Sequence, residues 1–419
     1  MCSPTPLTSI PRWANIPINL HDTDSSHRRR RVLDSLLCGR LLAAGNEVLG
    51  LGDLFTGLCL NIDELLDNRR FELMWHDVIW CMLVPSMDSP THSGYIDPWD
   101  HEALDYRGLS DRDGVLVKPD GSGYPVRGGV ARFIGRDPLD DWILKCIGVV
   151  RATEGPTQSQ ASVESFGFQW NWDSNPRTEE DLLWRVATRF GLDPAVFSDK
   201  RVLDAGCGAG AQSEFLAKAG AQVSAVDLSS AIDVAARRPE LRDARLAQGD
   251  LAHLPFANAA FDIVYCEGVL QHTAATEPIL AEFSRVLVPG GMLLATHYLR
   301  PEGVLRTACW VAHEGLRSLA KRLPREWLFL ASGVAAAAAL VPGLGWPLRK
   351  TLVPTNVRMP TLKATWSNVY DSYGQHEFQR HLRLDEYFGA VRAAGFTSVE
   401  QPGAEVAPWR KKFDGDRTP

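Results

Sequence analysis

The stretch Arg201-Val-Leu-Asp-Ala-Gly-Cys-Gly-Ala-Gly210 carries the strongest structural signal in the chain. Its apolar start predicts a strand, and Asp204 stands at the end of that strand. Three alternating glycines then form a turn in which the backbone can approach a ligand, because no Cβ is in the way. The Ala-rich segment 211–219 predicts a following helix. A strand, a glycine turn and a helix N-terminus in this order are typical of the nucleotide-binding corner of an open α/β sheet.

Asp204 bears on which nucleotide this corner binds. The run also fits a loose dinucleotide pattern, in which Gly206 and Gly208 precede an Ala at the third glycine position. A pyrophosphate gains nothing from a carboxylate at Asp204, whereas a ligand with an ammonium and a sulfonium centre does. The Asp-x-Gly-x-Gly-x-Gly form resembles motif I of the class I S-adenosylmethionine-dependent methyltransferases. The alternatives are a turn or capping role for Asp204 and an NAD(P)-dependent oxidoreductase.

Further segments follow in the order that this resemblance requires. A second predicted strand ends at Asp227, whose carboxylate can accept both ribose hydroxyls. Residues 246–251 resemble the family's adenine-side motif, in which Asp250 meets the exocyclic amine and Leu251 packs on the ring. The family's fourth strand and its fifth strand, which follows a Pro-Gly-Gly turn, have counterparts at 261–266 and 286–295.

The resemblance implies an α/β fold, a Rossmann-like seven-stranded mostly parallel sheet with helices on both faces, plus a helical N-terminal region and a helical insert. We expect the methyltransferase domain over 165–299 and 380–403. Before it we expect a helical or irregular region over 1–111, with helices at 32–42, 62–75 and 78–84, a hairpin over 112–135 and a linker over 136–164. The remaining parts are a substrate-side helical insert over 300–379 and a tail over 404–419.

The predicted hairpin contains a Gly-Tyr-Pro-Val segment that resembles the end of the small Trm112-like zinc-ribbon module. The metal cysteines of such a module would precede Tyr124, where this chain reads Leu116-Val-Lys-Pro-Asp-Gly-Ser. The module would therefore have lost its metal and kept its hairpin. The eight cysteines of the chain stand singly, without a Cys-x-x-Cys pair, so no metal site is predicted.

The resemblance implies S-adenosyl-L-methionine as the cofactor and assigns its contacts residue by residue. The cofactor-binding residues from motif I and the following acids are Asp204, Gly206, Cys207, Gly208, Gly210, Asp227, Leu228, Asp250 and Leu251. Glu267, after the fourth strand, is a further candidate. Gln169 is another, because the aromatic segment 165–172 resembles a flap over the cofactor. The alternative for the tryptophans of this flap is packing at the sheet edge.

Methyl transfer from a sulfonium is an in-line displacement that requires alignment and exclusion of water. A base is needed only if the acceptor must lose a proton. His272 is the candidate catalytic base because it follows the fourth strand, at the edge where an acceptor approaches. The alternative for His272 is local hydrogen bonding. His297, Tyr298 and Tyr373 are candidates for the acceptor pocket.

Composition narrows the class of partner. The chain has 419 residues and a net charge of −7, which argues against nucleic acid. Its hydrophobic and charged contents of 45% and 23% are ordinary for a globular protein. The N-terminus lacks the basic and apolar regions of a signal peptide, so we expect a cytoplasmic protein. We expect a small-molecule acceptor; oligomeric state is not predicted.

The insert contains a segment, 327–346, without a charged residue, between basic flanks. Its length would suit a membrane span, but Gly333 and Pro342 break a helix, so we do not expect one. The alternatives are a helix over the substrate pocket and an interfacial hairpin over 321–350 that contacts membrane. We therefore expect methyl transfer to a small, apolar or lipid-like acceptor at O, N or C. A non-catalytic cofactor-binding scaffold is the remaining alternative.

Overall fold

The computed structural model divides the chain into two units, Met1–Leu83 and Val84–Pro419. It describes residues 48–50, 71–73, 92–110, 112–135, 137–152, 160–172, 179–341, 343, 345, 348, 361–400 and 410–417. In the first unit, β1 (Val48–Gly50) and β2 (Phe71–Leu73) pair in parallel. The helix expected at 62–75 is wrong where β2 lies, because the backbone N–H and C=O groups of 71–73 pair with β1 and do not form helical hydrogen bonds. The helices expected at 32–42 and 78–84 lie outside the described residues.

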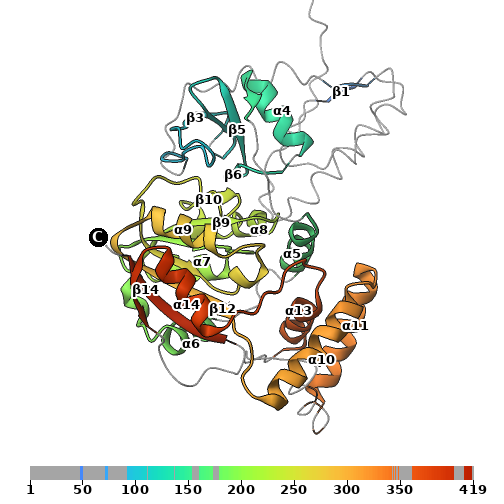
Figure 1. Cartoon of the computed structure of the whole chain (residues 1–419). Helices are drawn as coiled ribbons and strands as arrows, with labels where there is room; N and C mark the ends of the chain where they lie inside the picture. Colours follow the sequence, from blue (N-terminus) through green and yellow to red (C-terminus); the bar gives the residue numbers. More distant parts are fainter. Residues whose placement is uncertain are drawn as a thin grey trace, which may run out of the picture. The chain divides into compact units, whose positions relative to one another are not determined.

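A twelve-stranded sheet organises the second unit (Figure 1). Seven of its strands follow residue 200, in the spatial order β13-β14-β12-β11-β8-β9-β10. Neighbours among them pair in parallel, except that β14 runs antiparallel to β12 and β13. This arrangement confirms the Rossmann-like α/β fold. The strands are β8 (Arg201–Ala205), β9 (Gln222–Asp227), β10 (Arg245–Gln248), β11 (Phe261–Cys266), β12 (Leu287–Tyr298), β13 (Phe396–Glu400) and β14 (Arg410–Arg417).

Helices cover both faces of this part of the sheet, as predicted. One face packs against α9 (Glu277–Val286) and α14 (Leu384–Ala393) in a shared hydrophobic core. The other packs against α6 (Glu179–Arg189), α7 (Ala211–Lys218) and α8 (Ile232–Ala235) in a second core. Leu203 of β8 enters the first core and Val202 the second. A parallel strand buried on both faces is apolar throughout for this reason.

Five more strands, from residues 92–152, continue the sheet, and we call this segment the upstream module. It contains β3 (Asp105–Gly108), β4 (Gly114–Val117), β5 (Ser122–Arg127), β6 (Val130–Arg132), α4 (Pro138–Ile147) and β7 (Val150–Arg151). The sheet has twelve strands rather than the expected seven because β6 pairs in parallel with β10 and covers its edge. The segment 112–135 contains hairpins, but hairpins alone do not test the resemblance to the Trm112-like module, which stays a prediction.

The expected linker over 136–164 is largely secondary structure. Within it, α4 begins at the N-cap Asp137, ends at Gly148 and buries Ile143 and Leu144 against the strands of the upstream module. β7 pairs with β5, and α5 (Gln160–Trp172) starts before residue 164. The apolar positions of α4 needed the sheet as a partner, which the local sequence does not show.

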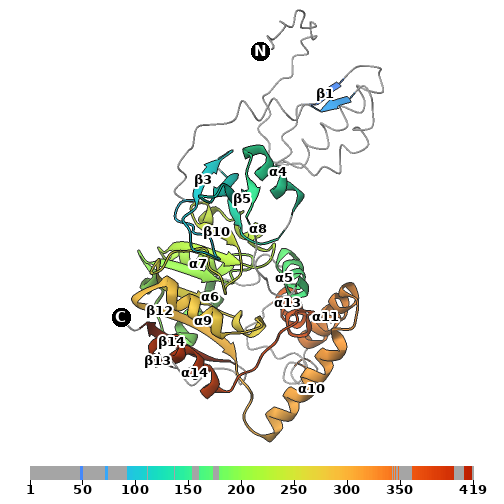
Figure 2. The same cartoon turned by 45° about the horizontal axis from the view of Figure 1, so that its top comes forward.

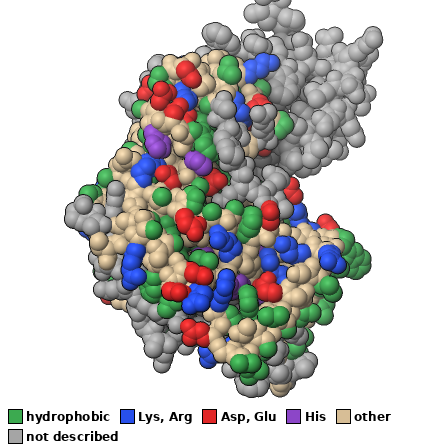
Figure 3. Space-filling model, in the orientation of Figure 1, with side chains coloured by type: hydrophobic (Ala, Val, Ile, Leu, Met, Phe, Trp, Pro, Cys, Tyr) green, Lys and Arg blue, Asp and Glu red, His purple; other side chains and the backbone are tan. Residues whose placement is uncertain are grey.

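The predicted insert is helical, with α10 (Val304–Ala320), α11 (Arg325–Leu340) and α13 (Leu362–Tyr373). Of these helices, α13 lies beside α5 in both orientations (Figures 1 and 2), and it also contacts α10 and α11. Among the described residues, no helix combines the length and apolar character that crossing a bilayer needs. Hydrophobic side chains lie along the outer edge of the insert (Figure 3). Trp327, Leu330 and Val334 of α11 are exposed. Membrane contact through 321–350 stays a prediction.

The segment 404–419, expected as a tail, contains β14. This strand lies between β12 and β13 and hydrogen-bonds to both. Its sequence, Arg410-Lys-Lys-Phe-Asp-Gly-Asp-Arg417, has no period-two apolar alternation. Pairing on both sides, rather than intrinsic preference, accounts for a strand here, so pattern reading missed it.

Candidate active site

The glycine turn after β8 has the left-handed backbone that favours glycine, with φ of 84°, 53° and 78° at Gly206, Gly208 and Gly210. A Cβ at the first and third of these would lie 2.4 and 2.6 Å from neighbouring side chains. At Gly208 the nearest atoms, in Trp170, would be 3.5 Å away. The first and third glycines therefore serve close packing, whereas Gly208 leaves space beside the turn.

A cavity of about 190 Å³ lies at the carboxyl ends of β8, β9, β10 and β11. It is lined by every predicted cofactor residue except Gly210, which packs against Ala235 of α8 instead. Of the predicted catalytic and acceptor residues, His272 and Tyr298 line it, while His297 and Tyr373 do not. The fold thus brings most of the predicted site to one place, although what these residues bind stays a prediction.

Asp227, at the end of β9, is held by three hydrogen bonds. Its Oδ2 accepts from the backbone N–H of Gly208 at 2.8 Å, and its Oδ1 accepts from the backbone N–H and the hydroxyl of Ser229 at 2.8 and 2.7 Å. Burial raises the pKa of the Asp227 carboxyl, while these hydrogen bonds lower it. The carboxylate is therefore oriented before any ligand arrives.

Two other acids line the same end of the cavity. Asp204 is buried, and its Oδ2 accepts a hydrogen bond of 2.6 Å from the Ser213 hydroxyl of α7. Asp250 is also buried and accepts from the backbone N–H of Ala252 at 3.0 Å. Three carboxylates from three adjacent strand ends therefore surround this part of the cavity, which suits a ligand rich in hydroxyl and ammonium donors.

Glu267 belongs to a buried charge network that the sequence analysis did not predict. Its Oε1 pairs with Arg185 of α6 at 2.7 Å and with Arg189, and its Oε2 accepts from the Tyr265 hydroxyl at 2.7 Å. Burial alone would lower the pKa of Arg185, but the charges of Glu267 and Asp181 outweigh burial and raise it. A usable signal was present in the sequence: Arg185 interrupts the apolar stripe of α6.

The aromatic helix α5 forms one wall of the cavity. Phe166, Gln169 and Trp170 line it, and the Gln169 amide donates to the backbone carbonyl of Ser367 in α13 at 3.4 Å. This helix is the segment expected as a flap over the cofactor, and that role stays a prediction. Trp170 stands over Gly208, which places an aromatic ring beside the glycine turn.

His272 ends η4 (Leu270–His272), just beyond β11. Its Nδ1 lies 3.2 Å from the backbone carbonyl of Phe378. A carbonyl only accepts, so Nδ1 carries the proton of the neutral ring and Nε2 carries the lone pair. The ring makes edge contacts with Phe166, Tyr298 and His376. Burial, and after it the nearby His272, holds the pKa of His376 well below its usual value.

His297 and Tyr373 are absent from the cavity for geometric reasons. His297 and Tyr298 are consecutive in β12, so their side chains point to opposite faces. His297 is buried against Tyr387 of α14, and burial lowers its pKa to about 4. Tyr373 packs on His313 of α10, and burial raises its pKa to about 12.

The opposite face of α13 supplies lining residues that were not predicted. Ala364, Ser367, Asn368 and Asp371 share the helical spacing that puts them on one side of α13. The Asn368 amide nitrogen is buried and has no hydrogen-bond partner among the residues that the structure describes. The cavity thus has a second polar end, provided by the insert.

Comparisons with known proteins agree with this geometry. A family model described as a methyltransferase domain matches residues 203–295. A demethylmenaquinone methyltransferase of Corynebacterium kroppenstedtii is 31% identical over 194 residues, which cover 45% of this chain and 79% of that protein. A malonyl-[acyl-carrier protein] O-methyltransferase of Enterobacter lignolyticus is 33% identical over 147 residues, or 34% of this chain, and the match spans only 55% of that relative.

A solved structure, magnesium protoporphyrin IX methyltransferase from Synechocystis PCC 6803 with bound S-adenosylhomocysteine, is similar at 16% identity with a TM-score of 0.32. The alignment covers 64% of this chain and 90% of that chain. The assignment of family rests on the sequence relatives, and it removes the oxidoreductase alternative. The chain belongs to the class I S-adenosylmethionine-dependent methyltransferases, with S-adenosyl-L-methionine as its cofactor.

Proposed function

We propose that this enzyme methylates a small, neutral, apolar or lipid-like acceptor that carries a hydroxyl group. The observation that carries the proposal is the continuity of the cavity. It runs from the three carboxylates at the strand ends to a wall of aromatic and small side chains from α5, η4 and α13. One of the two relatives is named for a demethylmenaquinone, and the other for a malonyl group carried on an acyl-carrier protein.

The cofactor end of the cavity has the donors and acceptors that S-adenosylmethionine requires. Asp227 would accept the ribose hydroxyls, Asp250 and Leu251 would hold the adenine, and Asp204 would bind the ammonium group. The cofactor would supply an electrophilic methyl group on sulfur. Trp170, which lies beside Gly208, would help to exclude water from that end.

The side chains at the acceptor end of the cavity favour an acceptor that donates a hydrogen bond over an acceptor that carries a negative charge. Asp371 and Asn368 line this end from α13. Among the described residues that line this cavity, Arg185 is the only Lys or Arg, and it is paired with Asp181 and Glu267. Arg317 lies outside the lining; burial lowers its pKa, against the charges of Glu314 and, after it, Asp371. An acceptor carboxylate would meet like charge here, whereas a hydroxyl would not.

His272 completes the proposed chemistry as the base. With Nδ1 directed to the Phe378 carbonyl, Nε2 can remove the proton of an acceptor hydroxyl. Loss of that proton makes either the oxygen or the carbon of an attached ring nucleophilic. Alignment of this atom with the methyl group and sulfur is then the remaining requirement.

The test uses the full chain, methyl-labelled S-adenosylmethionine and three acceptors: a demethylated naphthoquinol, a malonyl thioester and phosphoethanolamine. We expect label on the quinol. Label on the malonyl thioester alone would contradict the role of Asp371. Binding of S-adenosylhomocysteine without transfer to any acceptor in the panel would contradict the proposed acceptor class and favour the scaffold alternative.

A further inference from the structure

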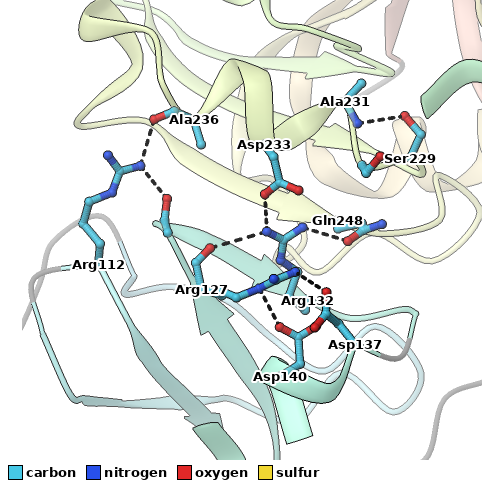
Figure 4. Close-up of polar contacts among 12 residues, drawn as sticks. Arg112, Arg127, Arg132, Asp137, Asp140, Ser229, Ala231, Asp233, Ala236 and Gln248 are labelled. Atoms are coloured by element: carbon cyan, nitrogen blue, oxygen red, sulfur yellow. Dashed lines mark hydrogen bonds and ion pairs between the residues drawn. The ribbon is translucent and has the colours of Figure 1, made fainter. Parts of the chain in front are cut away.

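Arg132, the last residue of β6, is buried where the upstream module meets the methyltransferase strands. Only 1% of the residue is exposed. Its guanidinium donates to the Gln248 side-chain oxygen at 2.8 Å and forms an ion pair with Asp233 (Figure 4). A third hydrogen bond, of 3.5 Å, reaches the backbone carbonyl of Arg127. Two of its partners therefore lie outside the upstream module, more than 100 residues along the chain.

Those two partners flank the two loops at the predicted adenosine end of the cavity. Asp233 lies in α8, directly after the turn in which Ser229 binds Asp227. Gln248 ends β10, two residues before Asp250. One guanidinium thus joins the helix that follows the loop after β9 to the strand end that precedes the loop after β10.

Gln248 extends this connection to a cavity residue. Its side-chain nitrogen donates to the backbone carbonyl of Leu228 at 3.3 Å, while its side-chain oxygen accepts from Arg132. The backbone N–H of Phe133 also donates to the Gln248 carbonyl at 3.0 Å. Leu228 lines the cavity, so a continuous chain of hydrogen bonds leads from the upstream module to the predicted adenosine site.

A second arginine of the upstream module, Arg127, serves as a matched control for Arg132. Arg127 pairs with Asp140 at 2.8 Å and with Asp137 at 3.1 Å, both at the start of α4 (Figure 4). Its side chain therefore stabilises the module internally. The contact between Arg127 and Arg132 uses the Arg127 backbone carbonyl, which a side-chain substitution leaves in place.

We propose that Arg132 is a positioning residue of the cofactor site, so that the upstream module sets the affinity for the adenosine half of S-adenosylmethionine. The inference rests on the proposed placement of the cofactor. Loss of Arg132 leaves Gln248 and Asp233 without their common donor, and the two loops lose the bond that fixes their separation. The buried Arg132 acts through Gln248 and Leu228, without touching the ligand itself.

The experiment titrates full-length Arg132→Met, Arg132→Lys and Arg127→Gln with S-adenosylhomocysteine and with 5′-methylthioadenosine, which lacks the amino-acid group. If the free energy of one hydrogen bond to a charged group is lost from ligand binding, the Kd of the ligand rises about tenfold. We expect this increase for both ligands in Arg132→Met, and partial recovery in Arg132→Lys. Arg127→Gln should lower Tm and leave both Kd values unchanged.

Separate outcomes contradict the inference and the proposed function. An unchanged Kd in folded Arg132→Met, with or without a lower Tm, would overturn the positioning role alone. A wild-type chain that binds neither ligand would contradict the cofactor placement, and the inference with it. If Arg132→Met does not fold, Asp233→Asn, which alters the partner on α8, should still raise both Kd values. An unchanged Kd in that variant would also overturn the inference.

Discussion

The backbone N–H of Gly208 donates to the carboxylate of Asp227 at 2.8 Å and thereby joins the glycine turn after β8 to the end of β9. The turn and the acid are separate motifs in the sequence, yet they form one unit in the fold. Because Ser229 holds the other carboxylate oxygen, the orientation of Asp227 is fixed in the free protein. A site organised in this way loses little entropy when it binds ligand.

Within the glycine turn, Gly206 and Gly210 pack closely against neighbouring side chains, whereas Gly208 has space on its cavity side. Gly208→Ala places a methyl group next to the cavity without a contact closer than 3.5 Å, and its φ of 53° is tolerable for Ala at about 1 kcal/mol. We expect a small fall in Tm and a loss of S-adenosylhomocysteine binding of at least about tenfold, which is 1.4 kcal/mol. Calorimetry and titration on the same preparation measure both.

Gly210→Ala is the control for that experiment. Its Cβ would lie 2.6 Å from Ala235 in α8, away from the cavity. The expected result is a larger fall in Tm than for Gly208→Ala, with most of the affinity kept in the folded fraction. Equal losses of affinity in the two variants would contradict a ligand-facing role for Gly208.

Substitution of His272 tests the proposed base. His272→Gln should lower kcat about 10²- to 10⁴-fold for a hydroxyl acceptor, the usual contribution of a general base. Without the base only the ionised acceptor reacts, so kcat of the variant should rise with pH up to the pKa of the acceptor. The Kd of S-adenosylhomocysteine should stay close to that of the wild type. A kcat within twofold of the wild type would leave His272 a hydrogen-bonding residue only.

Asp371 is expected to select the acceptor. Asp371→Asn should raise KM for a neutral hydroxyl acceptor about tenfold, through a lost charged hydrogen bond, and leave cofactor affinity unchanged. Tyr373→Phe is a matched control from the same helix, because Tyr373 packs on His313 outside the cavity. Steady-state kinetics with varied acceptor measure the effect. The same KM in both variants would exclude the role of Asp371.

Buried histidines predict acid sensitivity of the fold. Burial lowers the pKa values of His297 and His381 to about 4. Between about pH 6.5 and pH 4 the unfolded chain binds protons that the folded chain does not, so the free energy of unfolding falls as pH falls through this window. Tm measured from pH 7.5 to 4.5 should decrease accordingly. His297→Phe, which cannot titrate, should show a shallower decrease, and an equal slope would refute the assignment.

Local sequence predicted the parts of the site that depend on local backbone. Asp204, Asp227 and Asp250 each end or closely follow an apolar strand, and parallel strands bring such ends to one edge of the sheet. Gly210 was predicted as a cofactor residue from the same motif. The structure places Gly210 against Ala235 and outside the cavity lining, so its contact with the cofactor stays a prediction; the motif describes the turn without showing which glycine faces the ligand.

Most of the features that the sequence did not predict depend on contacts between residues far apart in the chain. Arg185 lies 82 residues from Glu267, so its place in the apolar stripe of α6 does not show which acid it pairs with. β6 joins the sheet only because β10 presents a free edge to it. Asn368 and Asp371 reach the cavity through the packing of α13 on α5, which periodicity within either helix does not reveal.

The most direct test of the account is titration of the purified full chain with S-adenosylhomocysteine, with Asp227→Asn as the matched variant. We expect saturable binding by the wild type. We also expect a Kd at least about tenfold higher in the variant, because the carboxylate proposed to accept the ribose hydroxyls is lost. Absence of binding by the wild type, or equal affinity in the two proteins, would contradict the cofactor site described at the ends of β8, β9 and β10.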